Sequence, residues 1–441
     1  MDLNLRFRLD QNSRIALVGG GGKTTLMFQL ARDFGTRVIC TTSTHLALDQ
    51  LDQADHHLVI TDPAGLPRSS DDFPEGILIV TGPQVEPNRV GGPPPEVMEE
   101  LVNLADLWHC PLIIESDGAR KLPLKAPADH EPPIPGFVTA VITVIGLSGL
   151  GKPLQGDWVH RPEYYSKLVG LPLGERLESH HLVKGLISPQ GGLKNIPVNA
   201  RKLLLINQID AFPNWKTFYD HMDLLLDHYH AVGFAVLEDR MLLEVQERIA
   251  GVVLAAGESS RFGEPKQLLD WYGKPLVSHA AQLAKEGGLK PVVVVTGADH
   301  DAVSETLRES QVVIANNPGW ASGQSSSVRV GVEALPEHVG GAVFLLVDQP
   351  LIPPELIRKL LQQHHTKPAA ITLPVVDGKP GNPVLFDRQV FDDLTQLEGD
   401  VGGRVLFERY PVQEIKWEDK QSQQDIDRPE DYQRIRFEED C

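Results

Sequence analysis

The stretch LAAGESSRFGEPKQLL, residues 254–269, is the strongest signal in the second half of the chain. The apolar run IAGVV precedes it, so the stretch leads from the end of a buried strand into a glycine turn. Further apolar runs follow, VVVV at 292–295 and VFLLV at 343–347, with helical stretches between them. Strands covered on both faces read as such continuous runs, so we predict an α/β domain with a mainly parallel sheet. We also expect a helix directly after Pro265.

The same stretch carries groups that suit phosphate. Small side chains let its backbone approach a triphosphate, and the predicted nucleotide-binding positions are Leu254, Ala255, Ala256 and Gly257. Arg261 and Lys266 are placed to neutralise phosphate charge, and we predict them to be catalytic. Nucleotidyl transfer needs little beyond such positioning and electrostatic stabilisation. The alternative is a surface turn with an unrelated basic pair.

Two acidic segments would complete this site. In FLLVDQP an apolar strand leads to Asp348, and ligands of open α/β sheets bind beyond the carboxyl ends of the strands. We therefore expect Asp348 to hold Mg²⁺ against phosphate oxygens and to be catalytic. In DIDRPEDY, Asp427 is the candidate second metal ligand. Its alternative role is to cap a helix that starts at Pro429, and the two roles are compatible.

Together these motifs resemble the molybdenum cofactor cytidylyltransferase group of the MobA-like nucleotidyltransferases. The resemblance covers 249–434 and includes NNPGWASGQSSSVRVGV, GKPGNPVLF and EGDVGGRVLF. It implies attack of the terminal phosphate of molybdopterin on the α-phosphate of CTP, with Mg²⁺ bound and pyrophosphate released. It also implies an acceptor contact from Arg404 and a nucleotide contact from Ser325, whose alternative role is a helix cap.

A second glycine-rich turn lies near the start of the chain. VGGGGKTTLM, residues 18–27, follows a strand-like run, and the apolar runs GILIV, PLIIE, AVITVI and KLLLIN come after it. The pattern predicts a P-loop-type domain, although Leu17 replaces the first glycine of the usual motif. Lys23 would reach the β- and γ-phosphates, and Thr24 would place its hydroxyl on Mg²⁺. The predicted nucleotide-binding positions are Gly19, Gly20, Gly21, Gly22, Lys23 and Thr24.

Two later segments would complete this second site. IIESDGAR ends a strand at Glu115 and Asp117, whose carboxylates suit Mg²⁺. LLLINQID places Asn207 and Asp210 after a strand, like the base-reading pair of guanine-binding P-loop proteins. However, Gln208 stands where such proteins have Lys, and Asn and Asp are common turn formers. The nucleotide of this site is therefore open between ATP and GTP.

The first half resembles the YqeC-like family of selenium-dependent hydroxylase accessory proteins. The matching residues are VGGGGKTT, TTSTH, ESDGARKLPLKAPADHEPPIP and NQID, within 12–236. The resemblance implies a nucleotide-dependent accessory step, such as selenium or sulfur delivery, in maturing a molybdenum hydroxylase that the protein would contact transiently. Five polar residues of these stretches are candidates for a substrate groove, with simple solvation as the default: His45, Lys121, Lys125, His130 and Glu131.

Length and composition set further limits. A chain of 441 residues is too long for one hydrophobic core, and we predict two three-layer αβα Rossmann-like domains at 1–240 and 248–441. The net charge of −19 argues against a nucleic-acid partner, which needs a basic face. The scattered Cys40, Cys110 and Cys441 argue against a disulfide framework or a zinc site. No signal-peptide pattern and no apolar run of 18 residues occurs, so we expect a cytoplasmic protein without a membrane partner.

Three functions stay open on the sequence. The leading one is a fused maturation enzyme, with nucleotidyl transfer in the second half and nucleotide binding or hydrolysis in the first. A transferase that uses GTP or another phosphorylated acceptor would share the same local chemistry. A non-catalytic cofactor carrier or insertion chaperone is the third, and the presence of Lys266 and Asp348 argues against it. Some relatives of the transferase group are described as oxidoreductases, but the chain has no GxGxxG motif with a following acidic residue.

Overall fold

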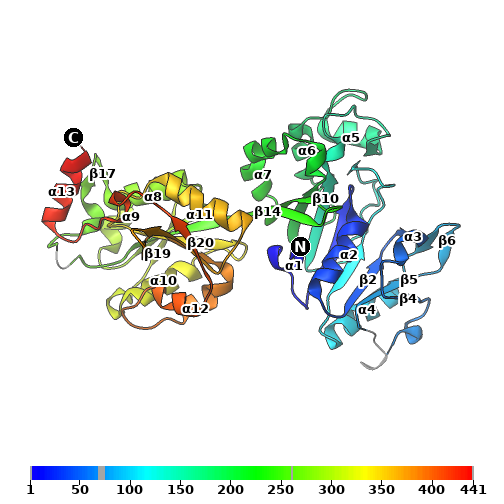
Figure 1. Cartoon of the computed structure of the whole chain (residues 1–441), viewed down its shortest axis with the longest axis horizontal. Coiled ribbons are helices and arrows are strands. Elements are labelled where there is room, and N and C mark those ends of the chain that lie inside the picture. Colours follow the sequence, from blue (N-terminus) through cyan, green and yellow to red (C-terminus); the bar gives the residue numbers. More distant parts are fainter. Residues whose placement is uncertain (1, 68–74, 260–261, 440–441) are drawn as a thin grey trace. The chain divides into compact units, whose positions relative to one another are not determined.

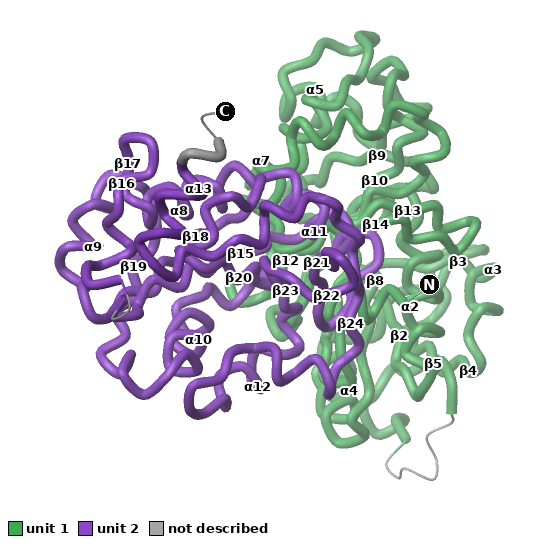
Figure 2. The backbone as a smooth tube through the Cα atoms, turned by 60° about the vertical axis from the view of Figure 1, so that its left-hand side comes forward, with its two compact units in different colours: residues 1–246 green, residues 247–441 purple. Residues whose placement is uncertain are grey.

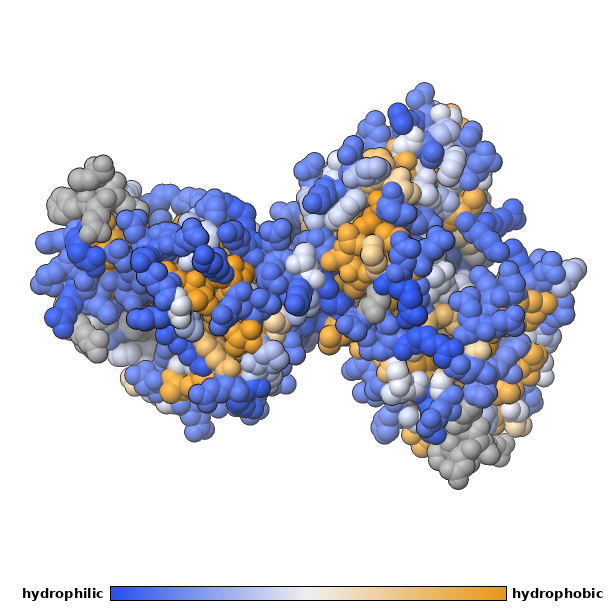
Figure 3. Space-filling view, in the orientation of Figure 1, coloured by the Kyte–Doolittle hydropathy of each residue, from blue (hydrophilic) through white to orange (hydrophobic). Residues whose placement is uncertain are grey.

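The structure is a computed structural model that describes residues 2–67, 75–259 and 262–439. The chain divides into two compact units, Met1–Gln246 and Glu247–Cys441, which are described separately (Figure 2). Hydrophilic residues cover most of the face of each unit that Figure 3 displays. Within the described ranges, no helix is long and apolar enough to cross a membrane.

The first unit is built on a sheet with the strand order β14-β13-β12-β10-β1-β8-β2-β5-β4. Its strands are β1 (Arg14–Gly19), β2 (Val38–Thr42), β4 (His56–Val59), β5 (Ile77–Thr81), β8 (Leu112–Glu115), β10 (Ala140–Gly146), β12 (Arg201–Asn207), β13 (Ala231–Val236) and β14 (Met241–Glu247). β1 pairs in parallel with both β8 and β10, and parallel pairing continues outward to β4 and β13. The loops after these strands therefore meet at one edge of the sheet, where a ligand site forms in such folds.

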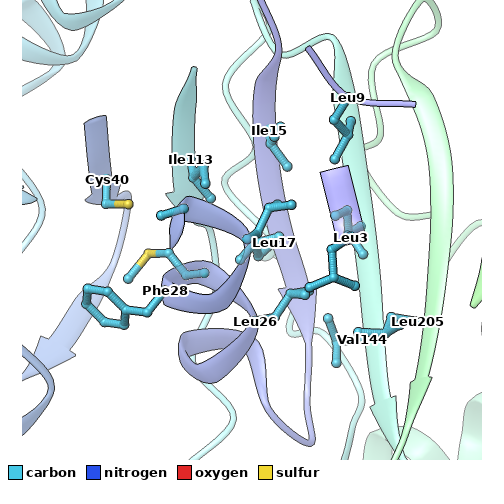
Figure 4. Packing of buried hydrophobic residues seen from close by; sticks show 14 of the residues in the cluster. Leu3, Leu9, Ile15, Leu17, Leu26, Phe28, Cys40, Ile113, Val144 and Leu205 are labelled. Atoms are coloured by element: carbon cyan, nitrogen blue, oxygen red, sulfur yellow. The ribbon is translucent and has the colours of Figure 1, made fainter. Parts of the chain in front are cut away.

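Helices cover both faces of this sheet. The helices are α1 (Leu3–Arg6), α2 (Lys23–Phe34), α3 (Leu48–Leu51), α4 (Pro95–Leu107), α5 (Pro162–Val169), α6 (Ser179–Leu186) and α7 (Met222–Leu226). On one face, Leu26 and Phe28 of α2 share a buried cluster with Leu17 of β1 and Ile113 of β8 (Figure 4). Alternate strand residues point to the other face, where α4 packs in one cluster and α5 and α6 in another.

Two small sheets extend from the first unit. One has the order β3-β7-β6, formed by β3 (His45–Ala47), β6 (Gln84–Glu86) and β7 (Arg89–Gly91). The other pairs β9 (Leu124–Lys125) with β11 (Val159–His160). Both lie in segments that link strands of the main sheet, and both contribute residues to the cleft described below.

The second unit has its own sheet, with the strand order β19-β18-β15-β20-β23-β21-β22 and with β24 paired to β21. Its strands are β15 (Ile249–Ala255), β18 (Val292–Thr296), β19 (Val313–Asn316), β20 (Gly341–Leu346), β21 (Ile371–Val376), β22 (Lys379–Pro380), β23 (Val384–Asp387) and β24 (Val412–Lys416). β15, β18, β19 and β20 are parallel, whereas β23 runs antiparallel to β20. The sheet is therefore mixed beyond its parallel core.

The helices of the second unit lie in two layers. They are α8 (Leu276–Glu286), α9 (His300–Thr306), α10 (Gln324–Glu333), α11 (Pro354–Thr366), α12 (Phe391–Thr395) and α13 (Pro429–Glu439). Figure 1 shows α8 and α11 on one side of the sheet and α10 and α12 on the other, in agreement with two separate buried clusters. The predicted α/β class and three-layer arrangement are confirmed.

One expectation about an element boundary needs correction. The helix expected after Pro265 is only the 3₁₀ turn η5 (Lys266–Leu268), and α8 starts at Leu276. Between them, β16 (Asp270–Trp271) and β17 (Lys274–Pro275) form a hairpin. Tyr272 and Gly273 at its tip have φ values of 48° and 84°, a conformation that ends any helix. At the domain boundary, β14 is the outermost strand of the first unit's sheet, and the chain divides after Gln246.

Candidate functional sites

The second unit has a cleft of about 630 Å³ at the carboxyl ends of β15 and β20. These strands are parallel neighbours, and β18 flanks β15 on its other side. The chain leaves β15 for β18, away from β20, so the cleft lies where the strand order reverses, the usual ligand position in open α/β sheets. The lining consists of 254–259, 320–324, 346–348, Phe262, Lys266, Gln267, Ser327, Asp400 and Asp427.

Lys266 is surrounded by acidic and carbonyl oxygens in this cleft. Its Nζ donates to Asp348 Oδ2 and to the carbonyl oxygen of Ile426, both at 2.9 Å, and lies 3.5 Å from Asp427 Oδ1. The side chain of Lys266 is 14% exposed, that of Asp348 24% and that of Asp427 55%. The structure therefore brings together the predicted cation and the two predicted carboxylates, with both carboxylates accessible from the cleft.

A third carboxylate lies behind this group. Asp425 accepts a hydrogen bond from Gln349 Nε2 at 2.7 Å, and the Ile426 N–H donates to the Asp348 carbonyl at 2.9 Å. Burial raises the pKa of Asp425, and the charges of Asp348 and Asp427 raise it further. These bonds fix the 425–427 segment against the end of β20, which holds Asp427 beside Lys266.

The loop after β15 is held by Gln267, a residue that the sequence analysis missed. Gln267 is buried, and its Nε2 donates to the carbonyl oxygens of Ala255 at 3.1 Å and Gly257 at 2.5 Å. The Lys266 N–H donates to Ser259 Oγ at 3.1 Å, which closes the loop from the other side. Among the described residues, no atom lies within 4 Å of a Cβ added at Gly257, which leaves space there for a ligand. The available signal was the position of Gln267 directly after Lys266.

The opposite wall starts at the N-terminus of α10. Ser325 Oγ donates to the carbonyl of Gly399 at 2.7 Å, so this hydroxyl ties α10 to the loop at 398–400. Asp400, also missed, accepts from the Gln324 N–H at 3.2 Å and lines the cleft. Arg404 is exposed in η8 (Gly403–Glu408) and is not part of the cleft lining in the described chain. The predicted catalytic residue Arg261 lies outside the described residues.

The first unit places its glycine turn at the carboxyl end of β1. The turn runs into α2, and Gly22 just before that helix has a φ of 128°. A Cβ at Gly22 would lie 2.7 Å from Asn207 Nδ2, so only glycine fits the turn against this neighbour. The turn forms part of a cleft of about 1140 Å³.

Lys23 and Thr24 meet the two predicted carboxylates at this turn. Lys23 Nζ donates to the Gly19 carbonyl at 2.7 Å and lies 3.1 Å from Asp117 Oδ1, and Thr24 Oγ1 donates to Glu115 Oε2 at 2.7 Å. Burial alone would lower the pKa of Lys23, but the charges of Asp117 and Glu115 outweigh it and raise the pKa above its ordinary value. Lys23 is therefore a cation at neutral pH. Burial raises the pKa of Glu115.

A buried ion cluster extends from the turn toward the cleft wall. Lys125 Nζ lies 2.9 Å from Asp117 Oδ2 and 2.8 Å from Glu131 Oε2, and Arg161 donates to both Glu131 oxygens at 2.6 and 2.9 Å. Asp117 Oδ2 also accepts from the Gly19 N–H at 3.0 Å, which connects the cluster to the turn. Burial opposes ionisation of Glu131, yet Arg161 and Lys125 lower its pKa to about 2. The sequence analysis named Lys125 and Glu131 only as candidates for a substrate groove, and it did not single out Arg161.

Asn207 and Asp210, the predicted base-reading pair, lie apart from the cleft. Asn207 is buried; its Nδ2 donates to the Gly21 carbonyl at 2.7 Å and its Oδ1 accepts from the Leu237 N–H at 2.9 Å. Asp210 is exposed in η3 (Ile209–Ala211). In the described chain neither residue lines the cleft, whereas Gln208 does. The contacts of Asn207 hold the glycine turn in place.

The donor sets of the two clefts differ in their fit to a divalent cation. Among the described residues, no group of three or more His, Cys, Asp or Glu side chains is arranged to hold a metal ion. Mg²⁺ in phosphoryl-transfer sites is usually held by one or two carboxylates together with substrate phosphates and water. Asp348 and Asp427 converge on one cation, the Lys266 ammonium, and fit that description. In the first unit, both carboxylate oxygens of Asp117 already pair with lysines. Thr24 and Glu115 are therefore the better candidates there for holding a divalent cation.

Comparison with known families assigns each half separately. The model of the MobA-like NTP transferase domain matches residues 251–415, and the model of the YqeC protein matches residues 15–163. The first match includes the 254–257 loop, Lys266 and Asp348; the second includes the glycine turn and the ion cluster up to Arg161.

Individual relatives agree with this division. YqeC of Escherichia coli (strain K12) is 36% identical over 206 residues, which is 45% of this chain and 77% of that protein. Nicotine blue oxidoreductase of Paenarthrobacter nicotinovorans is 31% identical over 198 residues, 42% of this chain and 96% of that enzyme. Among solved structures, Rv0371c from Mycobacterium tuberculosis H37Rv in complex with manganese is 28% identical, covers 43% of this chain and 97% of its own, and has a TM-score of 0.38.

Proposed function

Because the chain belongs to the YqeC family through its first unit and to the MobA-like NTP transferases through its second, we propose that it is a molybdenum-cofactor maturation enzyme. The second unit is a nucleotidyltransferase. In our proposal it transfers CMP from CTP to the terminal phosphate of a molybdopterin-type cofactor and releases pyrophosphate. We place this step in the cytoplasm, in keeping with the free, buried thiols of Cys40 and Cys110.

The observation that carries this proposal is the meeting of Lys266 with Asp348 and Asp427 in an open cleft. An ammonium placed between two carboxylates can move to a phosphate oxygen when a nucleotide brings further negative charge. In the low-dielectric environment of a cleft, such preorganised charge stabilises the charge that develops on phosphate during transfer. A redox function of the kind that names the Paenarthrobacter relative has no comparable support from this cluster of charges.

The backbone beside this cluster suits a triphosphate. In our proposal the N–H groups of 254–257 face the phosphates, with Gln267 keeping their loop in position. No atom of the part of the chain that the structure describes fills the space above Gly257, which supports close approach of a phosphate there. Arg261 and Arg404 are proposed to contact the triphosphate and the acceptor, respectively. Ser325 contributes by holding the loop that carries Asp400 against the N-terminus of α10.

We propose Mg²⁺ as the metal of the second unit, held by Asp348 and Asp427. When bound, the ion would neutralise charge on the phosphate oxygens. Asp348 and Asp427 would then exchange Lys266 for the metal as their counter-charge, which frees the lysine for the nucleotide. The exposure of both carboxylates supports this exchange, because neither is locked behind other side chains.

For the first unit we propose nucleotide binding at the glycine turn, by ATP or GTP, in an accessory step of the same maturation. Lys23 is a buried cation at the N-terminus of α2, where backbone N–H groups favour phosphate. Thr24 and Glu115 are the proposed partners of a second Mg²⁺, with Asp117 aiding through the glycine turn. The burial of Asn207 argues against guanine reading by that residue, so base choice would depend on other groups.

The experiment that tests the main proposal is pyrophosphate release by the full chain with Mg²⁺ and molybdopterin-type cofactor. CTP, GTP and ATP are compared, with Asp348→Ala as the inactive variant and Asp301→Ala, an exposed acid of α9, as the matched control. Release with CTP that Asp348→Ala abolishes supports cytidylyl transfer. Pyrophosphate release with GTP alone overturns the assignment of CTP as the substrate. Cofactor binding without pyrophosphate release favours the alternative of a non-catalytic carrier.

A further inference from the structure

The cleft of the first unit is larger than one nucleotide requires. It measures about 1140 Å³, whereas pockets for a single small ligand usually span roughly 300–1,000 Å³. The glycine turn, through 21–25, forms only part of its lining. The rest comes from the β3-β7-β6 sheet, the loop 118–122 and the segments around His130 and His160, which we call the outer wall.

The outer wall is basic although the chain as a whole carries a net charge of −19. Its basic and imidazole side chains are His45, Arg89, Arg120, Lys121, His130, His160 and Arg161. Of the acids that line the cleft, Glu131 is already neutralised by Lys125 and Arg161, and Glu115 is bound by Thr24 on the side of the glycine turn. Arg89 and Lys121 also have acidic neighbours outside the cleft lining, Glu86 and Asp49, each at 3.7 Å in an exposed pair. The residues that line the cleft therefore carry more basic than acidic side chains.

Two of these cations lie on the loop beside the glycine turn. Arg120 and Lys121 both have left-handed φ values, 52° and 61°, which are costly for such residues and persist only where the surroundings impose them. The next residue of this loop is bonded to the glycine turn, because the Gly21 N–H donates to the Leu122 carbonyl at 3.0 Å. Lys121 lies 3.7 Å from Asp49, with both side chains largely exposed, while Arg120 has no ion pair among the described residues.

His160 lines the same cleft, and its pKa is shifted. Burial, together with the charges of Arg161, Lys125 and Arg120, lowers its pKa to about 4. The imidazole is therefore neutral at physiological pH, and the charge of Arg120 reaches it across the cleft. A neutral His in this lining can donate to or accept from a bound anion without adding charge.

We propose that the outer wall binds a second ligand, a small dianionic molecule such as a phosphate monoester, next to the nucleotide on the glycine turn. The first unit then holds two ligands at once rather than a nucleotide alone, and this inference rests on the proposed nucleotide binding there. Arg120 offers a planar guanidinium fork that suits phosphate, and Lys121 adds a point charge. A dianion matches the excess positive charge better than a monoanion does.

The test uses the full chain saturated with Mg-AMPPNP or Mg-GMPPNP, whichever it retains, so that the glycine turn is occupied. Inorganic phosphate is titrated as the probe and binding is followed by calorimetry, with acetate as the monoanionic comparison. We expect one phosphate per chain, binding roughly tenfold weaker in Arg120→Gln and in Lys121→Gln, and acetate weaker than phosphate. Arg240→Gln, an exposed arginine outside the cleft lining, should bind phosphate like the native chain.

Three results would overturn the inference. The nucleotide-loaded chain does not bind phosphate, both cleft variants bind phosphate with the affinity of the native chain, or acetate binds with the same affinity as phosphate. If the chain retains neither nucleotide analogue, the proposed nucleotide site fails separately. Phosphate is then titrated into Lys23→Ala, which lacks the cation of the glycine turn. If Lys23→Ala binds phosphate and the added Arg120→Gln change weakens that binding, the second site is supported. If Lys23→Ala does not bind phosphate, the second site is refuted.

Discussion

Replacing Lys266 with methionine is the sharpest test of the second unit. The change keeps the length and apolar stem of the side chain but removes the ammonium, which has oxygen partners at 2.9, 2.9 and 3.5 Å. In our mechanism this group stabilises charge on the transferring phosphate. Loss of one preorganised group of that kind typically lowers kcat by about 10²–10³, or ~2.7–4 kcal/mol in the activation barrier.

The same change should leave the fold almost intact. Asp348 and Asp427 keep access to water in the cleft, so losing their counter-charge should cost only about 1 kcal/mol of stability. Activity is measured as pyrophosphate release, and stability by thermal unfolding. Lys367→Met, an exposed lysine at the end of α11, is the matched control and should change neither.

A double variant adds a second check. Since Lys266 and Asp348 act on the same phosphates, Lys266→Met combined with Asp348→Asn should lose much less than the product of the two single losses. Our reasoning is refuted if folded Lys266→Met retains more than about a third of native kcat. It is also refuted if the activity of Lys266→Met is low only because the variant is unfolded at the assay temperature.

Four further outcomes are expected. Gly257→Ala should keep its melting temperature but bind CTP roughly tenfold more weakly, since the added methyl occupies ligand space, and unchanged CTP affinity would contradict this. Asn207→Ala should weaken nucleotide binding by the first unit without changing its ATP-to-GTP preference; a switch in preference would restore base reading. Glu131→Gln should lower the free energy of unfolding by about 2 kcal/mol at pH 7. This difference from the native chain should shrink as the pH falls from 4.5 toward 2, because native Glu131 takes up its proton in that range. A difference that does not depend on pH would exclude the ionic role of Glu131. In a Cys441→Ser background, Cys40 and Cys110 should resist a thiol reagent at pH 8 until urea is added, because burial raises the pKa of both thiols, and rapid native labelling would disprove their burial.

The two sheets and their glycine turns could be predicted because the signals are local. A continuous apolar run followed by small residues reads as a buried strand and a ligand-binding turn wherever it occurs. The polar residues that end such strands, Asp348, Glu115 and Asp117, must gather at the edge where parallel strands finish. For this reason the sequence was sufficient to place Lys266 and Asp348 in one site.

The helix expected after Pro265 was wrong for an equally local reason. QLLDWYGKPLVSH contains enough apolar residues for a helix, but its Tyr-Gly pair forms the tip of a hairpin. Two residues with positive φ in succession stop a helix that the apolar spacing would favour. Turn chemistry therefore outweighed hydrophobic pattern at this position.

Local patterns in the chain are enough to predict the pair of α/β domains, the phosphate chemistry of their turns and the main charged residues of the second site. The contacts that support these features become visible only in the folded protein. Gln267 acts through the carbonyls of Ala255 and Gly257, and Asn207 through backbone groups 186 and 30 residues away. The linkage of Asp117 to Arg161 through buried charges likewise depends on segments that meet only after folding. Such contacts leave no periodic mark in a sequence, because their energy comes from pairing buried polar groups with whichever partners the fold brings near.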